Sequence, residues 1–242
     1  SSLHSNVALV VTGPTAIDVL KTEQSVAQMS KGSMPMVIMG EFEAAKTEPQ
    51  VQVLTEKAIY DQVLAAIESS QKAGVELDLS MFYLSERRII QALIAAHERG
   101  VKVRVLLDPN KDAFGRTKNG IPNRPVAAEL HHAGIDVRWC NTQGEQCHSK
   151  MLLKRSMYNS EIILGSANFT ARNLKNYNLE TNLRVVGHAN AKVFTDATQY
   201  FERAWHNQDG QQHSVDYAQY ADESTFKYVL YRVMEWTGLS TF

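Results

Sequence analysis

The chain has 242 residues, of which 44% are hydrophobic and 21% are charged, as in an ordinary globular protein. Its 25 basic and 26 acidic residues leave a formal net charge of −1. Proteins that bind nucleic acid through many phosphates usually carry a positive excess, so this charge balance argues against a general nuclease. No apolar run approaches the roughly 20 residues that a membrane-spanning helix requires.

The N-terminal region resembles a later part of the same chain. Residues 3–10 (Leu-His-Ser-Asn-Val-Ala-Leu-Val) match residues 179–186, and each run precedes a glycine and an amphipathic segment. The two amphipathic segments are expected to be helices, at 16–29 and 189–206. Two interpretations stay open: an internal repeat, or two unrelated strand-helix units of similar period.

The repeat interpretation divides the chain into three parts. Residues 1–30 are then the C-terminal remnant of a first domain, 31–50 are a connecting segment with Gly and Pro, and 51–242 are a whole second domain. The chain begins with Ser1-Ser2 rather than methionine, so we expect it to be a piece of a longer protein.

Strand-like and helix-like segments alternate through the rest of the chain. Strands are expected at residues 51–54, 75–83, 101–107, 135–139, 148–153, 161–168 and 178–186. Helices are expected at 56–71, 124–133, 189–206 and 221–237, and in a segment that Ser85 caps and that ends at Glu98. This alternation predicts a layered α/β sandwich.

Two cysteines, Cys140 and Cys147, bracket the loop 141–146. They either form a disulfide that closes this short loop or are both reduced, and the sequence does not choose. No second Cys or His pair lies at ligand spacing, so we expect no zinc site. The acidic residues do not cluster either, and we predict catalysis without a metal or cofactor.

The most informative pattern is His148-Ser149-Lys150, followed after fourteen residues by Gly165-Ser166-Ala167-Asn168. Because side chains alternate along a strand, His148 and Lys150 are expected on one side of one strand. Ser166 and Asn168 share a side in the same way. If the strands are neighbours, an imidazole, an ammonium, a hydroxyl and an amide converge. Such a set suits a phosphate group, with an attacking or protonating residue and donors for the oxygens.

This arrangement resembles the phospholipase D superfamily, whose signature is His-x-Lys, four residues and Asp, and then Gly, Ser or Gly, any residue, and Asn. The resemblance extends through residues 82–84 and 89–108 and on to Asn182. It implies a phospholipase D-like α-β-α sandwich with a mixed sheet. The chain departs from the signature at Arg155, which stands where the family has Asp. On a regular strand this position faces away from His148, so we interpret the family's Asp as structural.

The resemblance also implies roles for the site residues. One histidine of a pair forms a phosphohistidine, and the second protonates the leaving alcohol and then activates water or an acceptor alcohol. Which role His148 takes stays open. Lys150 and Asn168 are expected to stabilise the phosphate oxygens, and Ser166 either binds substrate or supports the turn. Glu180 is expected beside His148, where a carboxylate fixes the imidazole tautomer.

A basic segment at residues 109–125 carries Lys111, Arg116, Lys118 and Arg124. We expect a loop over the site in which Lys111 and Arg116 recruit an anionic substrate, although a solvated surface loop is the alternative.

The terminal helix carries an apolar stripe with few lysines opposite it, which favours core or interface over membrane anchor. The stripe comprises Phe226, Val229, Leu230, Val233 and Trp236.

Three functions follow from these observations. The first is hydrolysis or transphosphatidylation of a phosphodiester, of phospholipid type. The second is a nuclease of the same superfamily, formed by a homodimer, and the third is a non-catalytic half that completes or regulates a larger assembly. Charge balance favours the first.

One His-x-Lys set supplies one histidine, whereas the mechanism uses two. We therefore expect a missing N-terminal half or a second copy to complete the site. Peripheral membrane contact fits a phospholipid substrate, and the resemblance favours a bacterial membrane-associated or periplasmic setting over a cytoplasmic one.

Overall fold

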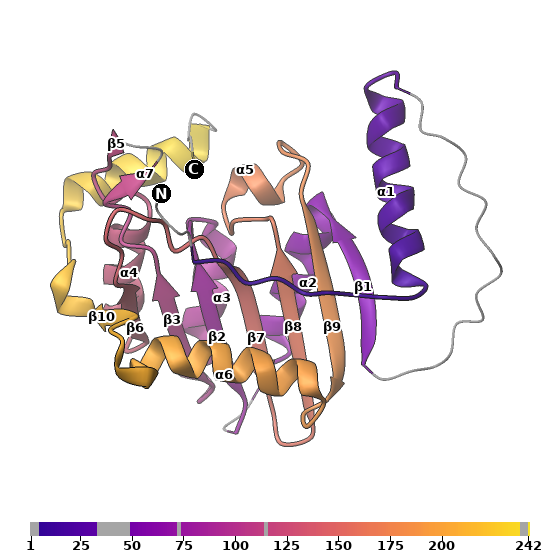
Figure 1. Ribbon diagram of the computed structural model, residues 1–242. Coiled ribbons are helices and arrows are strands. Elements are labelled where there is room, and N and C mark those ends of the chain that lie inside the picture. The colour runs from indigo at the N-terminus through magenta and orange to yellow at the C-terminus, as the bar shows by residue number, and fades with distance from the viewer. Residues whose placement is uncertain (1–4, 33–48, 72–73, 114–115, 238–241) are drawn as a thin grey trace.

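The computed structural model describes residues 5–32, 49–71, 74–113, 116–237 and 242, and its centre is an eight-stranded sheet (Figure 1). The strand order is β1-β9-β8-β7-β2-β3-β6-β10. Two neighbouring pairs, β2–β3 and β3–β6, are parallel, and the other pairs are antiparallel, so the expected mixed sheet is confirmed. The strands are β1 (Gln50–Thr55), β2 (Glu76–Met81), β3 (Lys102–Leu107), β6 (Asp136–Cys140), β7 (Lys150–Arg155), β8 (Asn159–Gly165), β9 (Thr181–His188) and β10 (Ser214–Asp216).

Helices cover both faces of the sheet and complete the expected α-β-α sandwich. On one face α6 (Lys192–His206) crosses the strands, and α2 (Glu56–Glu68), α3 (Arg87–Glu98) and α4 (Asn123–His132) lie behind them (Figure 1). Each face has its own apolar core. The remaining elements are α1 (Thr15–Met29), the short pair β4 (Asp112–Ala113) and β5 (Arg116–Thr117), α5 (Ala171–Leu174) and α7 (Thr225–Thr237).

The alternation of side chains along β7 places Arg155 on the face opposite to Lys154, and therefore opposite to Lys150. Lys154 Nζ donates to Ala66 O of α2 at 3.1 Å, whereas Arg155 Nη2 lies 3.6 Å from Glu202 of α6. The expectation that residue 155 faces away from the motif lysine is thus confirmed.

A buried ion cluster occupies the α6 face at this end of the sheet. Asp78 of β2 has 0% side-chain exposure and accepts from Arg155 Nη2 at 2.6 Å and from Arg104 Nε at 2.7 Å. Arg104 Nη2 reaches Glu202 at 2.6 Å, and its guanidinium lies 4.9 Å from the Phe201 ring centroid. A buried carboxylate is tolerated only when its charge is paired, so each member of this cluster depends on the others.

The strand of the first expected strand-helix unit, at residues 3–10, does not form in the part that the structure describes. Residues 1–4 lie outside the described part, and from Ser5 onward the structure shows a single bridge, to Cys147. The segment crosses in front of the sheet toward α1, and Val7 and Leu9 pack against the core on the α6 side (Figure 1). The helix expected after it is confirmed as α1. Most of the expected connecting segment, residues 33–48, lies outside the described residues, so the three-part division stays a prediction.

Element ends differ from the expected ones by a few residues. The N-cap of α3 is Glu86, whose side chain accepts from Ile89 N at 3.0 Å, and not Ser85. The helix expected from residue 189 begins at Lys192. Within the described residues, no helix has both the length and the apolar character needed to cross a bilayer.

We predict that Asp78→Asn lowers the free energy of unfolding by about 3 kcal/mol, because the substitution leaves the buried Arg104 with Glu202 as its only close carboxylate partner in the cluster. Urea unfolding followed by circular dichroism measures the effect. Asp61→Asn is the matched control: Asp61 pairs with Lys57 on the surface, and the change is expected to cost less than about 0.5 kcal/mol. Equal midpoints for the two variants would contradict a structural role for the cluster.

Candidate active site

The two halves of the motif meet at one end of neighbouring strands. β7 begins at Lys150, β8 ends at Gly165, and the two strands pair antiparallel with Met151 opposite Leu164. Lys150 and Ser166 therefore emerge at the same end of the sheet. His148 lies two residues before β7, so the expectation that it shares a strand with Lys150 is wrong. Its backbone N–H donates to Ser5 O at 2.9 Å.

The chain that follows β2 lies between the two motif halves. Phe82 N donates to Ser149 O at 3.0 Å on one side. On the other side Phe169 N donates to Tyr83 O at 3.1 Å, and Asn168 Oδ1 accepts from Tyr83 N at 3.2 Å. The sequence around Phe82 thus connects the His-x-Lys half to the Gly-Ser-x-Asn half through backbone hydrogen bonds.

The Phe82 ring is a shared contact of the imidazole and the ammonium. The ring centroids of Phe82 and His148 are 4.9 Å apart, and Lys150 Nζ lies 5.1 Å from the Phe82 centroid. Lys150 Nζ also donates to the backbone carbonyl of His148 at 2.9 Å. The two side chains therefore lie close together as predicted, and both contact the Phe82 ring.

Lys150 is buried, and burial shifts the pKa of its ammonium. Desolvation lowers the pKa of the Lys150 ammonium to about 8, although the negative charges of Glu180 and Asp108 oppose this shift. The ammonium therefore remains largely protonated at neutral pH. A buried cation beside an imidazole can stabilise charge on a phosphate oxygen more strongly than a solvated lysine can.

Glu180 lies one residue before β9, and both of its oxygens have hydrogen-bond donors. Ser166 Oγ donates to Oε2 at 2.5 Å, and Asn173 Nδ2 of α5 donates to Oε1. The structure thus brings Glu180 to Ser166 and into the electrostatic environment of Lys150. The predicted role in fixing the tautomer of His148 stays a prediction.

Several residues that hold the site were missed by the sequence analysis. Asp108 follows β3, accepts from Cys147 N at 2.8 Å and from Asn110 N at 2.7 Å, and is buried, which raises the pKa of its carboxyl to about 6. Asn123 Nδ2 donates to Phe82 O at 2.7 Å and to Asp108 O at 2.8 Å. A detectable signal existed for Asp108, because polar residues at the carboxyl ends of parallel strands often line sites.

The two cysteines form a disulfide beside His148. Lys111 contacts the loop that this disulfide closes: its Nζ donates to Thr142 O at 2.5 Å. Arg116 lies in β5, but its side chain falls outside the described part of the structure. The roles of Lys111 and Arg116 in recruiting substrate therefore stay predictions.

Across the described residues, no group of three or more His, Cys, Asp or Glu side chains has the arrangement of a metal site. Catalysis without a metal or cofactor stays a prediction of the motif chemistry.

Residues 63–205, more than half of the chain, match the family model described as cardiolipin synthase, PLD-like domain. The chain belongs to the phospholipase D superfamily. The mitochondrial cardiolipin hydrolase of Homo sapiens is 29% identical over 133 residues, which are 55% of this chain and 46% of that protein. The hydrolase of Mus musculus is 28% identical over 142 residues, which are 59% and 57% of the two chains. This chain therefore spans about half the length of the curated relatives it matches.

Solved structures support the same fold. Nuc, a phospholipase D family member from Salmonella typhimurium, superposes with a TM-score of 0.53 at 23% identity, covering 70% of this chain and 98% of Nuc. The phosphatidylserine synthase of Haemophilus influenzae Rd KW20 gives a TM-score of 0.53 at 12% identity and covers 96% of this chain and 55% of the synthase. At these identities the likeness concerns the fold alone, and it confirms the α/β sandwich of the superfamily.

We predict that Lys150 titrates near pH 8, as followed by the NMR signal of its ε-carbon. Glu180→Gln is expected to lower this midpoint, because the carboxylate of Glu180 favours the ammonium form. Glu76→Gln is the control, since Glu76 lies at the other end of β2, opposite Arg155. A midpoint near the ordinary lysine value of about 10.4 would show that the ammonium is not desolvated.

Reducing the Cys140–Cys147 disulfide is predicted to lower the free energy of unfolding by about 2.5 kcal/mol, because the unfolded chain then regains the entropy of an open loop. Urea unfolding with and without a phosphine reductant measures this loss. The Cys140→Ser/Cys147→Ser double variant should show the same loss without reductant and no further change with it. Identical midpoints for the oxidised and reduced wild-type chain would refute the stabilising role.

Proposed function

We propose that this chain supplies one half of a phosphodiesterase or phosphatidyltransferase site that acts on a phospholipid-type diester. The second half carries another His-x-Lys set and comes from a second copy or from further sequence on the N-terminal side. The proposal rests on membership of the superfamily, and the names of the cardiolipin hydrolase relatives favour a phospholipid over other diesters.

One observation carries the chemistry: the His148 ring and the Lys150 ammonium lie against the same Phe82 ring, 4.9 Å and 5.1 Å from its centroid. An imidazole and a buried ammonium held together in this way match the two requirements of phosphoryl transfer. The first is a group that attacks phosphorus or protonates the leaving oxygen, and the second is a cation for the nonbridging oxygens.

The reaction then proceeds in two displacements. One imidazole of the pair attacks phosphorus and forms a P–N bond, and the P–O bond to the alcohol breaks as the second imidazole protonates the leaving oxygen. The second imidazole next takes a proton from water or an acceptor alcohol, whose oxygen attacks phosphorus and releases the first imidazole. His148 is one member of this pair.

The neighbouring groups support the same transfer. Lys150 stabilises the negative charge that accumulates on the nonbridging oxygens. Asn168 accepts from Tyr83 N through Oδ1, which orients the amide so that Nδ2 is its donor end. Ser166 is held by Glu180 at 2.5 Å and supports the turn that presents Asn168. Substrate contact by Ser166 remains a further part of the proposal.

We predict that the chain as a strict monomer has little activity, and that restoring a second His-x-Lys half produces hydrolysis of bis(4-nitrophenyl) phosphate and of phospholipid in mixed micelles. In the complemented enzyme, His148→Asn should reduce kcat/KM by about 10³-fold or more, because it removes a group essential to both displacements. Acid-labile phosphate on a histidine, detected by mass spectrometry of a trapped reaction, identifies the intermediate.

His188→Asn serves as the matched control, because His188 lies exposed at the end of β9 and is expected to leave kcat/KM unchanged. Full activity from a strict monomer would contradict the requirement for two histidines. Cleavage of single-stranded DNA in preference to the phospholipid would instead favour the homodimeric nuclease, and complementation without any turnover would favour a non-catalytic half.

A further inference from the structure

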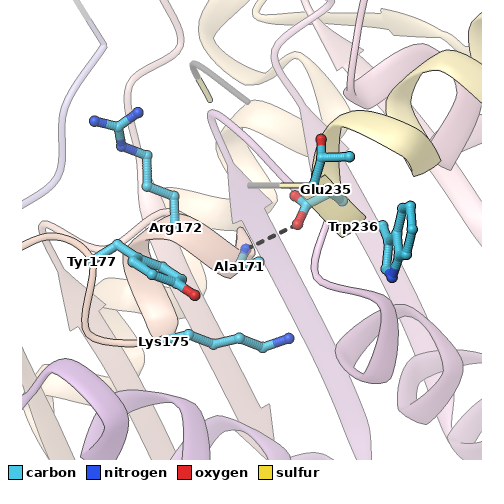
Figure 2. Close-up of a pocket in the computed structure, with 7 residues that line it drawn as sticks. Ala171, Arg172, Lys175, Tyr177, Glu235 and Trp236 are labelled. Atoms are coloured by element: carbon cyan, nitrogen blue, oxygen red, sulfur yellow. Dashed lines mark hydrogen bonds between the residues drawn. The ribbon is translucent and has the colours of Figure 1, made fainter. Parts of the chain in front are cut away.

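A pocket with a volume of about 540 Å³ opens between α5, the turn after it, and α7 (Figure 2). Figure 2 shows Arg172, Lys175 and Tyr177 on one side of the pocket, and Glu235 and Trp236 of α7 on the other. The two sides are joined where Glu235 Oε2 accepts from Ala171 N at 3.3 Å. None of these residues belongs to the proposed catalytic set.

The charges around this pocket favour an anionic, oxygen-rich group. Arg172 and Lys175 are cationic, and the nearest carboxylate partner of Lys175 is the buried Glu86, at 3.2 Å. Glu235 Oε1 is buried and has no hydrogen-bond partner among the described residues. Burial, with a contribution from Glu86, raises the pKa of Glu235 to about 7 against the opposing effects of Ala171 N–H and Lys175, so a large share of this carboxyl is neutral near pH 7.

The apolar stripe of α7 lies open beside the pocket. Phe226, Val229, Val233 and Trp236 are 74%, 52%, 47% and 87% exposed, so these positions are not part of the core, and the core part of the earlier expectation is wrong for them. The opposite side of the helix packs inward through Tyr231, which is fully buried. Arg232 is also exposed on α7, but its guanidinium contacts Tyr228, with Nη1 donating to Tyr228 Oη at 3.0 Å, so it is not counted as part of this surface.

The pocket and the stripe form one surface next to the active site. Trp236 belongs to both, because it lines the pocket and ends the stripe. The helix α5 separates the pocket from the site: Ala171 and Arg172 line the pocket, and Asn173 donates to the candidate catalytic residue Glu180. We define the α7 docking face as Phe226, Val229, Val233 and Trp236 together with Arg172 and Lys175.

We propose that the α7 docking face binds the surface of an anionic phospholipid bilayer, with the apolar stripe at the headgroup–acyl boundary and a lipid phosphate in the pocket. This inference rests on the proposed function in one respect: it names bilayer-resident lipid as the source of the diester substrate.

The arrangement of the side chains fits a bilayer better than it fits a second copy of the chain. Phe226 and Trp236 are the most exposed members of the stripe, and Arg172 and Lys175 line the pocket together with Trp236, so apolar and cationic groups lie side by side as they do at a lipid interface. A two-fold dimer centred on the stripe would bring Arg172 and Lys175 of both copies into one interface. Like charges placed together in this way oppose association.

Co-sedimentation with vesicles of defined composition tests the proposal. The 242-residue chain is expected to bind phosphatidylcholine vesicles containing 30% phosphatidylglycerol about tenfold more tightly than pure phosphatidylcholine vesicles. Phe226→Ala/Trp236→Ala should weaken binding to the mixed vesicles by about tenfold or more, because the stripe no longer buries its aromatic rings. Arg172→Ala/Lys175→Ala should abolish the preference for the anionic lipid.

Two matched controls separate these effects from general surface properties. Met157→Ala/Tyr158→Ala removes side chains that are 79% and 64% exposed in the β7–β8 turn, at the far end of the sheet, and should bind as wild type does. Lys57→Ala/Lys192→Ala removes two cations from surface ion pairs on α2 and α6 and should keep the lipid preference. Thermal unfolding of every variant checks that loss of binding is not loss of fold.

Absence of wild-type binding to the mixed vesicles, or equal binding by the stripe variant, would overturn the proposal. A second outcome would also overturn it: the wild-type chain is a dimer that does not bind vesicles, and Phe226→Ala/Trp236→Ala converts it to a monomer. A second copy of the chain would then occupy the face. The complemented wild-type enzyme is assayed in parallel on soluble bis(4-nitrophenyl) phosphate. Turnover of this diester without vesicle binding rejects only the docking face, and vesicle binding without turnover rejects only the proposed function.

Discussion

The geometry of the site depends on how the backbone after β2 is hydrogen-bonded between the two halves of the motif. Phe82 N donates to Ser149 O, and on the opposite side Ser85 N and Glu86 N both donate to Phe169 O at 2.9 Å. Buried backbone groups must be paired, so neither half can shift without leaving donors unsatisfied. Asn123 Oδ1 accepts a further hydrogen bond from Leu84 N at 2.9 Å. The relative position of the two motif halves is therefore set by this third segment together with the β7–β8 hairpin that joins them.

The sequence predicted seven of the eight strands of the central sheet, the layered fold and the approach of His148 to Lys150, because each of these follows from local alternation or from the motif itself. The sequence did not predict that the segment after β2, around Phe82, lies between the two motif halves in space. Its hydrogen bonds join residues about 70 or more positions apart, and such pairing leaves no local pattern. The same reason applies to Arg155. Alternation along β7 was enough to predict its face, but its partner Asp78 became visible only with the order and register of the strands.

The N-terminal segment shows the limit of reasoning from internal similarity. Residues 5–10 share the apolar alternation of residues 181–186, and only the latter form a strand. An alternating sequence can pair with a sheet edge, but it needs an unpaired edge to do so. The outer edge of β9 is already paired with β1 along six positions, from Gln50 to Thr55. Among the described strands the outer edge of β1 is open, so alternation alone does not decide the pairing. The segment crosses the sheet instead, and its bridge to Cys147 fixes the backbone next to His148.

Electrostatics link this scaffold to the proposed chemistry. Lys150 is buried beside Phe82, and the carboxylates of Glu180 and Asp108 favour its charged form, yet their oxygens are bonded to other donors. The two carboxylates thus favour the protonated ammonium without forming a hydrogen bond to it. Nζ can therefore still bind an oxygen of a substrate phosphate. By linkage, an anion bound near Nζ and the protonated state of Lys150 stabilise each other, and the gain is greater in a desolvated setting than at the surface. Burial of the lysine, which costs folding energy, is therefore what makes its positive charge effective toward a phosphodiester.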